Sequence, residues 1–205
     1  QELKKAIRKV ENIMEKGDFE SYDMCEEYIR DAISVGELNN EDFEIFSELE
    51  ALLEEDYRHP LATGIDGLDN ILNGGLAKGE IGVVLAPTGV GKTTLLTRFA
   101  NTAYNMGYNV LQIFFEDNPK IIQRKHFTCW TGIPSQDLGE HKETVLDKAD
   151  EMKKTGGRLI LKKLPSDELN MLQIKNQVRK IISEGIKLDM VLIDYIDCII
   201  PDRSF

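Results

Sequence analysis

The nine residues from Ala86 to Thr94, Ala-Pro-Thr-Gly-Val-Gly-Lys-Thr-Thr, have the clearest chemical potential in the chain. With alanine at the first glycine position, they fit the loop that binds nucleotide phosphates. Two glycines allow a tight turn that points successive N–H groups at phosphate oxygens. The lysine would contact the β- and γ-phosphates, and the first threonine hydroxyl would bind Mg²⁺. We therefore expect ATP and Mg²⁺ at Ala86, Pro87, Thr88, Gly89, Val90, Gly91, Lys92, Thr93 and Thr94.

Two carboxylates that follow apolar runs complete the expected site. Asp194 follows Met-Val-Leu-Ile, and an aspartate at the carboxyl end of a buried strand can hold the hydration shell of Mg²⁺. Glu116 follows another apolar run, and we expect it to deprotonate the attacking water, which contributes about 10²–10⁴-fold in rate. Lys92 and Glu116 are thus the expected catalytic residues. Asp117 is the rival base, and we otherwise expect it to cap the next helix, although both carboxylates could serve as caps.

Apolar runs that alternate with helical stretches must position these groups. The runs are rich in β-branched residues and cover 81–86, 109–115, 158–162 and 189–194. Strands of this kind that alternate with helices predict βαβ units, in an α/β fold with a mostly parallel sheet and helices on both faces. The strand ends at one edge of such a sheet would meet the nucleotide.

The first 60 residues differ from the rest in charge and periodicity. They hold 18 Asp and Glu but only 7 Lys and Arg, whereas the remaining residues hold 18 of each. Apolar spacing predicts three short amphipathic helices, over about 3–14, 22–32 and 46–53, with Asn40 as a possible cap of the third. Pro60 ends this region. We expect a small acidic all-helical segment or linker over 1–60, packed on its own or a neighbouring subunit, and an ATPase core over 61–205.

The composition excludes several classes of protein. The 41% apolar and 30% charged residues are ordinary for a globular chain. No apolar run approaches the roughly 18 residues of a membrane span, the N-terminus resembles no secretory signal, and three scattered cysteines exclude a disulfide framework or zinc ribbon. We expect a cytoplasmic protein. The lack of basic excess excludes a broad duplex-binding face but not a narrow basic channel.

Three weaker features have simple interpretations. The basic residues over 153–163 favour a solvated face at a helix end and strand edge rather than a nucleic-acid patch. We expect Phe127 and Trp130 to pack in the core. The three histidines are too scattered in sequence to indicate a metal site.

The segment from Thr63 to Glu80, here called the lead-in segment, resembles the start of RecA-type ATPase cores. DnaB-like replicative helicases, RadA-type repair proteins and clock-type ATPases share that start. Glu116 is similar in position to the catalytic glutamate of this superfamily. Asp194-Tyr195 resembles the second motif of DnaB-like helicases, and Arg124 with Thr131-Gly-Ile resembles helicases of bacteriophage replication.

The resemblance implies a phage-type hexameric ring that hydrolyses ATP and moves along single-stranded DNA in replication, with a primase or helicase loader as possible partners. The alternative is a nucleotide-gated regulatory or repair ATPase of the RadA or clock type; a small-molecule kinase is disfavoured. The family's DNA-contacting loops, γ-phosphate sensor and arginine finger would lie beyond Phe205, although residues 201–205 could begin a channel loop. An arginine finger contributes about 10³–10⁵ in rate, so we expect the isolated chain to be weakly active.

Overall fold

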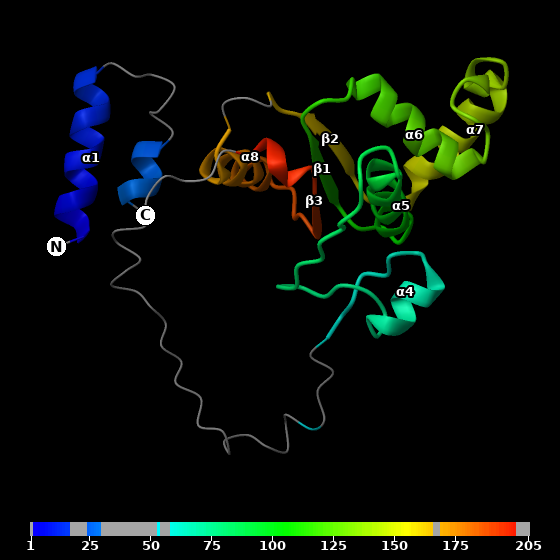
Figure 1. Ribbon diagram of the computed structural model, residues 1–205, viewed down its shortest axis with the longest axis horizontal. Helices are drawn as coiled ribbons and strands as arrows, with labels where there is room; N and C mark the ends of the chain where they lie inside the picture. Colours follow the sequence, from blue (N-terminus) through cyan, green and yellow to red (C-terminus); the bar gives the residue numbers. More distant parts are fainter. Residues whose placement is uncertain (1, 17–23, 30–52, 54–57, 166–168, 200–205) are drawn as a thin grey trace. The chain divides into compact units, whose positions relative to one another are not determined.

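The computed structural model describes residues 2–16, 24–29, 53, 58–165 and 169–199, drawn in colour in Figure 1. The chain divides into two compact units, residues 1–55 and 56–205, which are described separately. Within the described residues, no helix combines the length and the apolar character that crossing a membrane requires.

The described part of the first unit is helical. Helix α1 (Glu2–Lys16) confirms the helix expected over 3–14, and residues 24–29 of the second expected helix are helical too. The Lys9 ammonium group lies 4.6 Å from the centre of the Tyr28 ring, a cation–π contact that joins the two segments. The third expected helix lies outside the described residues apart from residue 53.

The second unit contains a parallel sheet of three described strands in the order β2-β1-β3. The strands are β1 (Val110–Phe114), β2 (Leu159–Lys163) and β3 (Met190–Asp194). In the register, Leu111 lies opposite Ile160 on one side and Val191 on the other. Three of the four predicted strands are therefore confirmed, each within one residue at its start.

Helices cover both faces of this sheet (Figure 1). Side chains alternate along β1, and those on one face pack with α8 (Met171–Ser183) in a cluster of buried residues: Leu111, Ile113, Phe115, Leu164, Leu169, Ile174 and Ile181. Helix α5 (Lys92–Asn105) packs against β1 and β3, and α6 (Pro119–Thr131) packs against α5 and β2. The expected α/β architecture with two covered faces is confirmed.

Local sequence explains where these helices begin. The Asn170 side chain accepts a 2.9 Å hydrogen bond from the Gln173 N–H, and the Gln173 side chain accepts one of 2.9 Å from the Asn170 N–H. This reciprocal capping satisfies two N–H groups that a helix start leaves unpaired. Helix α7 (Lys142–Met152) and the single 3₁₀ turns η2 (Asp137–Gly139) and η3 (Lys153–Thr155) connect α6 to β2.

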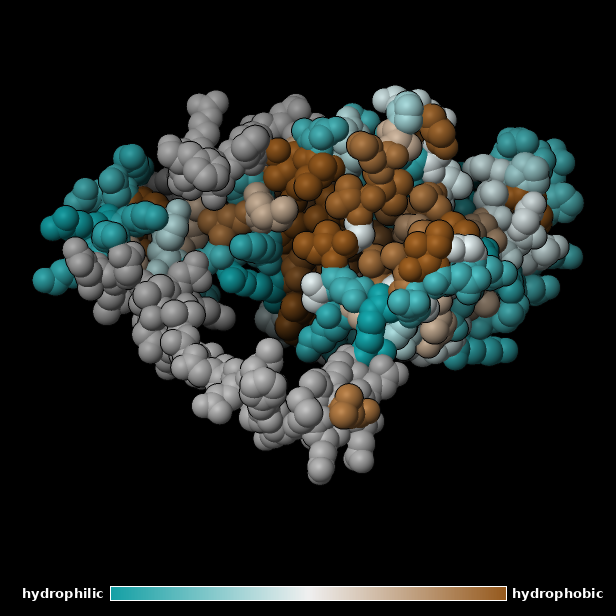
Figure 2. Space-filling view, turned by 60° about the horizontal axis from the view of Figure 1, so that its bottom comes forward, coloured by the Kyte–Doolittle hydropathy of each residue, from teal (hydrophilic) through white to brown (hydrophobic). Residues whose placement is uncertain are grey.

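The fourth predicted strand, over residues 81–86, is not formed. This segment pairs with no strand, and Ile81, Val83 and Leu85 are 88%, 80% and 96% exposed. A strand is stable only when its N–H and C=O groups pair with a neighbour. Among the described residues, β3 pairs with β1 and with no other strand, so this run is not added at the other edge of β3. The apolar side chains of this run therefore remain at the surface. Figure 2 shows that hydrophobic residues gather in the middle of one face of the molecule.

Two side chains hold the lead-in segment, which contains the short helix α4 (Asp66–Ile71). An antiparallel bridge joins Leu76 of this segment to Leu61, which precedes it. The Asp69 carboxylate accepts hydrogen bonds from the Thr63 N–H and hydroxyl, both 2.7 Å, and from the Gly64 N–H at 3.0 Å. Arg58 binds both carboxylate oxygens of Glu80, at 2.8 and 2.9 Å. Because Arg58 donates to this carboxylate, the pKa of Glu80 falls to about 2.

Candidate nucleotide-binding site

The loop before α5 is closed by its own lysine. The Lys92 ammonium group donates to the carbonyl oxygens of Ala86, at 2.8 Å, and of Pro87, at 3.2 Å. Gly89 and Gly91 have φ angles of 81° and 101°, in the left-handed region where a side chain would cause strain. Lys92 is also the first residue of α5, so its charge coincides with the positive end of the helix dipole. The loop thus gathers the groups that bind anionic phosphates.

Asp194 and Thr93 provide oxygens that suit Mg²⁺. Asp194 is the last residue of β3 and is only 8% exposed. Among the described residues, none donates a hydrogen bond to its carboxylate or pairs with it. An aspartate at the carboxyl end of a strand can bind a cation, and Thr93 lies in the first turn of α5, the helix that packs against β3. Hydroxyl and carboxylate oxygens are ligands that Mg²⁺ accepts.

Glu116 is held from both neighbouring strands. It follows the central strand β1, and its main-chain carbonyl accepts a 3.2 Å hydrogen bond from Lys163, the last residue of β2. Its carboxylate accepts a 3.0 Å hydrogen bond from the hydroxyl of Tyr195, which follows β3. These contacts place the exposed carboxylate at the strand ends where Asp194 also lies.

The hydrogen bond between Glu116 and Tyr195 also changes the pKa of the tyrosine. The hydrogen bond to Glu116, with a second one to Cys198, raises the pKa of Tyr195 to about 12. The hydroxyl is therefore protonated at neutral pH and acts as a donor toward Glu116. The sequence places Tyr195 in a motif but predicts no contact for it, because the tyrosine and the glutamate are 79 residues apart in the chain.

The expected cap of α6 is corrected. The side chain of Asn118, not Asp117, accepts the Lys120 N–H at 2.9 Å, and Pro119 occupies the first turn. A cap must directly precede the first helical residue, and Asp117 lies one residue too early. Asp117 instead pairs with Lys125 at 2.8 Å. Its carboxylate is thereby directed toward α6.

A buried polar network connects α5, α6 and β1. The His126 ring contacts the Asn101 side chain through Nδ1, at 2.6 Å, and the Gln112 side chain through Nε2, at 3.1 Å. Burial lowers the pKa of His126 to about 4. The imidazole is therefore neutral at physiological pH and links the phosphate-loop helix to the strand that precedes Glu116. Residue spacing gave no indication of this network.

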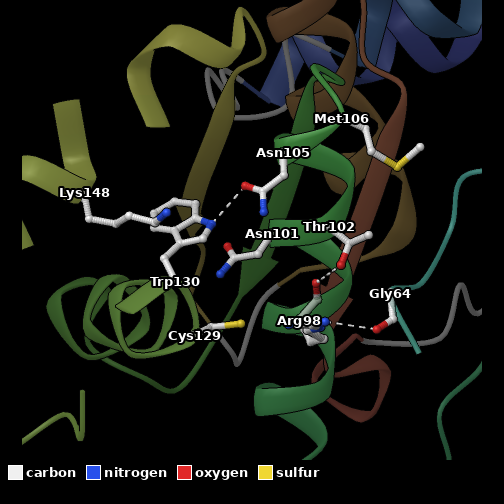
Figure 3. A pocket seen from close by; sticks show the side chains of 9 residues that line it. All are labelled: Gly64, Arg98, Asn101, Thr102, Asn105, Met106, Cys129, Trp130 and Lys148. Atoms are coloured by element: carbon white, nitrogen blue, oxygen red, sulfur yellow. Dashed lines mark hydrogen bonds between the residues drawn. The ribbon is translucent and has the colours of Figure 1, made fainter. Parts of the chain in front are cut away.

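Two adjoining hollows follow the groove between α5 and α6. The first has a volume of about 580 Å³ and adjoins the phosphate loop at Val90 and Gly91, a size suited to a small molecule. The second, of about 410 Å³, lies farther along α5 and is shown in Figure 3. Arg98 and Cys129 line both hollows. The groove therefore continues from the loop toward the C-terminal end of α5.

The second hollow combines cationic, amide and aromatic groups. In Figure 3 the Trp130 indole N–H donates to Asn105, at 3.1 Å, and the Arg98 guanidinium donates to the Gly64 carbonyl, also at 3.1 Å. Trp130 also packs edge-on against Phe127, with ring centres 5.4 Å apart. The two rings pack against each other, but both are only half-buried and Trp130 also borders the hollow. They therefore lie at the edge of the core rather than within it.

Other residues singled out from the sequence have structural contacts. Arg124 donates to the carbonyl oxygen and, at 3.3 Å, to the hydroxyl of Ser135. Lys153 pairs with Asp150 at 2.7 Å, and both side chains are largely exposed, as expected for the solvated basic stretch. The expected channel-loop residues 201–205 lie outside the described residues.

The chain is similar to a known family of ATPases and to known DNA repair proteins. The protein-family model described as "ATPase: KaiC" matches residues 61–204. The DNA repair protein RadA of Aquifex aeolicus is 30% identical over 125 residues, which are 61% of this chain and 25% of that protein. RadA of Mycobacterium tuberculosis is 32% identical over 95 residues, 44% of this chain and 20% of that protein. The matched part thus spans a quarter or less of these relatives.

Proposed function

Because this chain belongs to the KaiC family of ATPases, we propose that it hydrolyses ATP as a nucleotide-gated regulatory or repair ATPase of the RadA or clock type. ATP would be bound with Mg²⁺ at the loop from Ala86 to Thr94. The observation that supports this most is the loop at the start of α5, which Lys92 closes. The Asp194 carboxylate, which has no partner among the described residues, lies at the end of the strand that α5 covers.

The described residues divide the reaction between them. Lys92 and the loop N–H groups bind the phosphates, and Thr93 and Asp194 would hold Mg²⁺, which neutralises charge on the β- and γ-phosphates. Glu116 accepts a proton from the attacking water. The water oxygen bonds to the γ-phosphorus while the bond to the β–γ bridging oxygen breaks. The products are ADP, inorganic phosphate and a proton that Glu116 releases to solvent.

The comparisons also bear on the process that ATP hydrolysis would drive. The relatives are named as DNA repair proteins, which favours control of assembly or partner binding in repair or regulation over replicative unwinding. Under this proposal the protein forms a homo-oligomer, and single-stranded DNA is a partner to be tested.

A DnaB-like replicative helicase, of the phage kind, is the second candidate. The sequence pair Asp194-Tyr195 favours it. That function would require a hexameric ring, movement along single-stranded DNA and a primase or loader as partner. Neither candidate changes the roles proposed for Lys92, Thr93, Glu116 and Asp194.

Steady-state ATP hydrolysis by the full-length protein, with and without single-stranded DNA, tests both candidates. ATP hydrolysis without unwinding of a forked duplex supports the regulatory or repair function. Strong stimulation by single-stranded DNA together with ATP-dependent unwinding would replace it with the helicase. A full-length protein that binds no ATP would contradict both.

A further inference from the structure

We propose that the Tyr195 hydroxyl positions the Glu116 carboxylate for its reaction with water, a role that rests on the proposed ATP hydrolysis. Tyr195 is a positioning residue in this proposal, because it acts on the substrate through Glu116. Its importance would follow from its place directly after Asp194.

The sheet brings the two residues together. In the register Asp194 lies opposite Phe114, two residues before Glu116. Tyr195 is extended, with φ −133° and ψ 165°, and precedes the 3₁₀ turn η4 (Ile196–Cys198). The Cys198 N–H donates to the Tyr195 carbonyl at 3.3 Å. The main chain of Tyr195 is thereby fixed at both ends, and its hydroxyl reaches Glu116 Oε1 at 3.0 Å.

This contact gives the two oxygens of the Glu116 carboxylate different roles. Oε1 accepts the tyrosine hydroxyl, while no residue in the described part of the chain donates to Oε2. A glutamate side chain has three rotatable bonds, and a fixed donor on one oxygen restricts where the other oxygen points. Oε2 therefore stays available to accept the proton of a water held in a constant direction.

The main chain of Glu116 is fixed separately. Lys163 of β2 donates to its carbonyl at 3.2 Å, so β2 holds the backbone and the residue after β3 holds the carboxylate. Because Tyr195 follows Asp194 directly, the same stretch of chain would place the metal-binding carboxylate and orient the base. Positioning of this kind affects turnover more than substrate binding.

The test compares Tyr195→Phe with the wild type in the full-length protein. The substitution removes one hydroxyl and keeps the ring. We expect kcat to fall about tenfold, the effect of losing one hydrogen bond to a charged group, while KM for ATP and the affinity for a fluorescent ATP analogue change by less than about twofold. Tyr104→Phe is the matched control, because it removes a hydroxyl that donates to the Met152 carbonyl at 2.8 Å. This control should leave kcat unchanged.

A double-mutant cycle with Glu116→Gln separates positioning from general structural damage. If Tyr195 acts through Glu116, adding Tyr195→Phe to Glu116→Gln should not lower the residual single-turnover rate further. An equal loss in both backgrounds would overturn the proposal. So would an unchanged kcat in Tyr195→Phe, or a raised one, since the latter would mean that the hydroxyl holds the carboxylate away from water.

The same data distinguish this proposal from the proposed function. An inactive Glu116→Gln with a fully active Tyr195→Phe would overturn the role of Tyr195 alone. A fully active Glu116→Gln would remove Glu116 from the proposed reaction, and the role of Tyr195 with it.

Discussion

The Lys92 ammonium group donates a 2.8 Å hydrogen bond to the carbonyl oxygen of Ala86, six residues earlier in the chain. This contact closes the loop around the lysine and holds the charge at the start of α5. Because the contact is made to the main chain, it depends little on which side chain occupies position 86. It therefore explains how the loop keeps its shape with alanine in place of the usual first glycine.

Replacing Lys92 with alanine should weaken ATP binding about 10- to 100-fold, because a hydrogen bond to a charged group contributes about 1.5–3 kcal/mol. The affinity for a fluorescent ATP analogue is the measurement. Lys175→Ala on the exposed side of α8 is a matched loss of positive charge and should keep wild-type affinity. Equal affinities in all three proteins would exclude a phosphate contact for Lys92.

Glu116→Gln should lower kcat about 10²–10⁴-fold, since the amide cannot accept the proton of water, while ATP binding is retained. The adjacent Asp117→Asn is the control, because Asp117 makes a partly exposed ion pair with Lys125, and such pairs contribute little. Its turnover should stay within about twofold of the wild type. The opposite pattern, with Asp117→Asn inactive, would make Asp117 the base.

Asp194→Asn should raise the Mg²⁺ concentration needed for half-maximal hydrolysis by about 10- to 100-fold, as found when partners of bound metal ions are lost. Asp189→Asn is the control. Asp189 lies just before the first residue of β3, at the opposite end from Asp194, and its carboxylate accepts a hydrogen bond from the Asn109 N–H at 2.9 Å. A magnesium titration of both variants is the measurement. If only Asp189→Asn raised the Mg²⁺ concentration needed for hydrolysis, the metal would bind near the start of β3, and the proposed role of Asp194 would be wrong.

His126 should make the protein less stable in mild acid. Its pKa is about 4 in the fold, below the free value of 6.5, so the unfolded chain binds a proton that the folded chain does not. The contribution of His126 to the free energy of unfolding is fully present above pH 6.5. It is lost as the pH falls toward 4, and this loss amounts to about 3 kcal/mol. Denaturant unfolding across this range should show a smaller pH dependence in His126→Asn than in the wild type. His141→Asn, at an exposed site, controls for the loss of an imidazole.

Gly75→Ala should destabilise the lead-in segment strongly. The residue has a φ of +120°, and a Cβ there would lie 1.9 Å from the Leu61 carbonyl oxygen. Gly67 in α4 has no neighbour within 4 Å of an added Cβ. Gly67→Ala should therefore raise the free energy of unfolding by about 0.5–1 kcal/mol, because alanine has the higher helix propensity. Thermal unfolding of both variants checks this pair. Similar melting temperatures would contradict the close approach at Gly75.

The sequence by itself determined most of the elements and predicted which residue types make up the proposed site. The loop from Ala86 to Thr94, the apolar runs before Glu116 and Asp194, and the helical spacing between them are local patterns. Three of the four predicted strands formed, because each pairs within a described sheet. The run at 81–86 had the same apolar character but formed no strand. Whether a segment becomes a strand depends on a paired neighbour, which composition does not contain.

Only the tertiary structure decided which side chains meet. Asp117 and Asn118 are both good cap residues, and the start of α6 selected Asn118. His126 gained its partners from α5 and β1, and the Tyr195 hydroxyl reached Glu116 across adjacent strands. These contacts join residues 14 to 79 positions apart. Local patterns report the face or strand end on which a residue lies, whereas strand register and helix packing set the distance between two such residues.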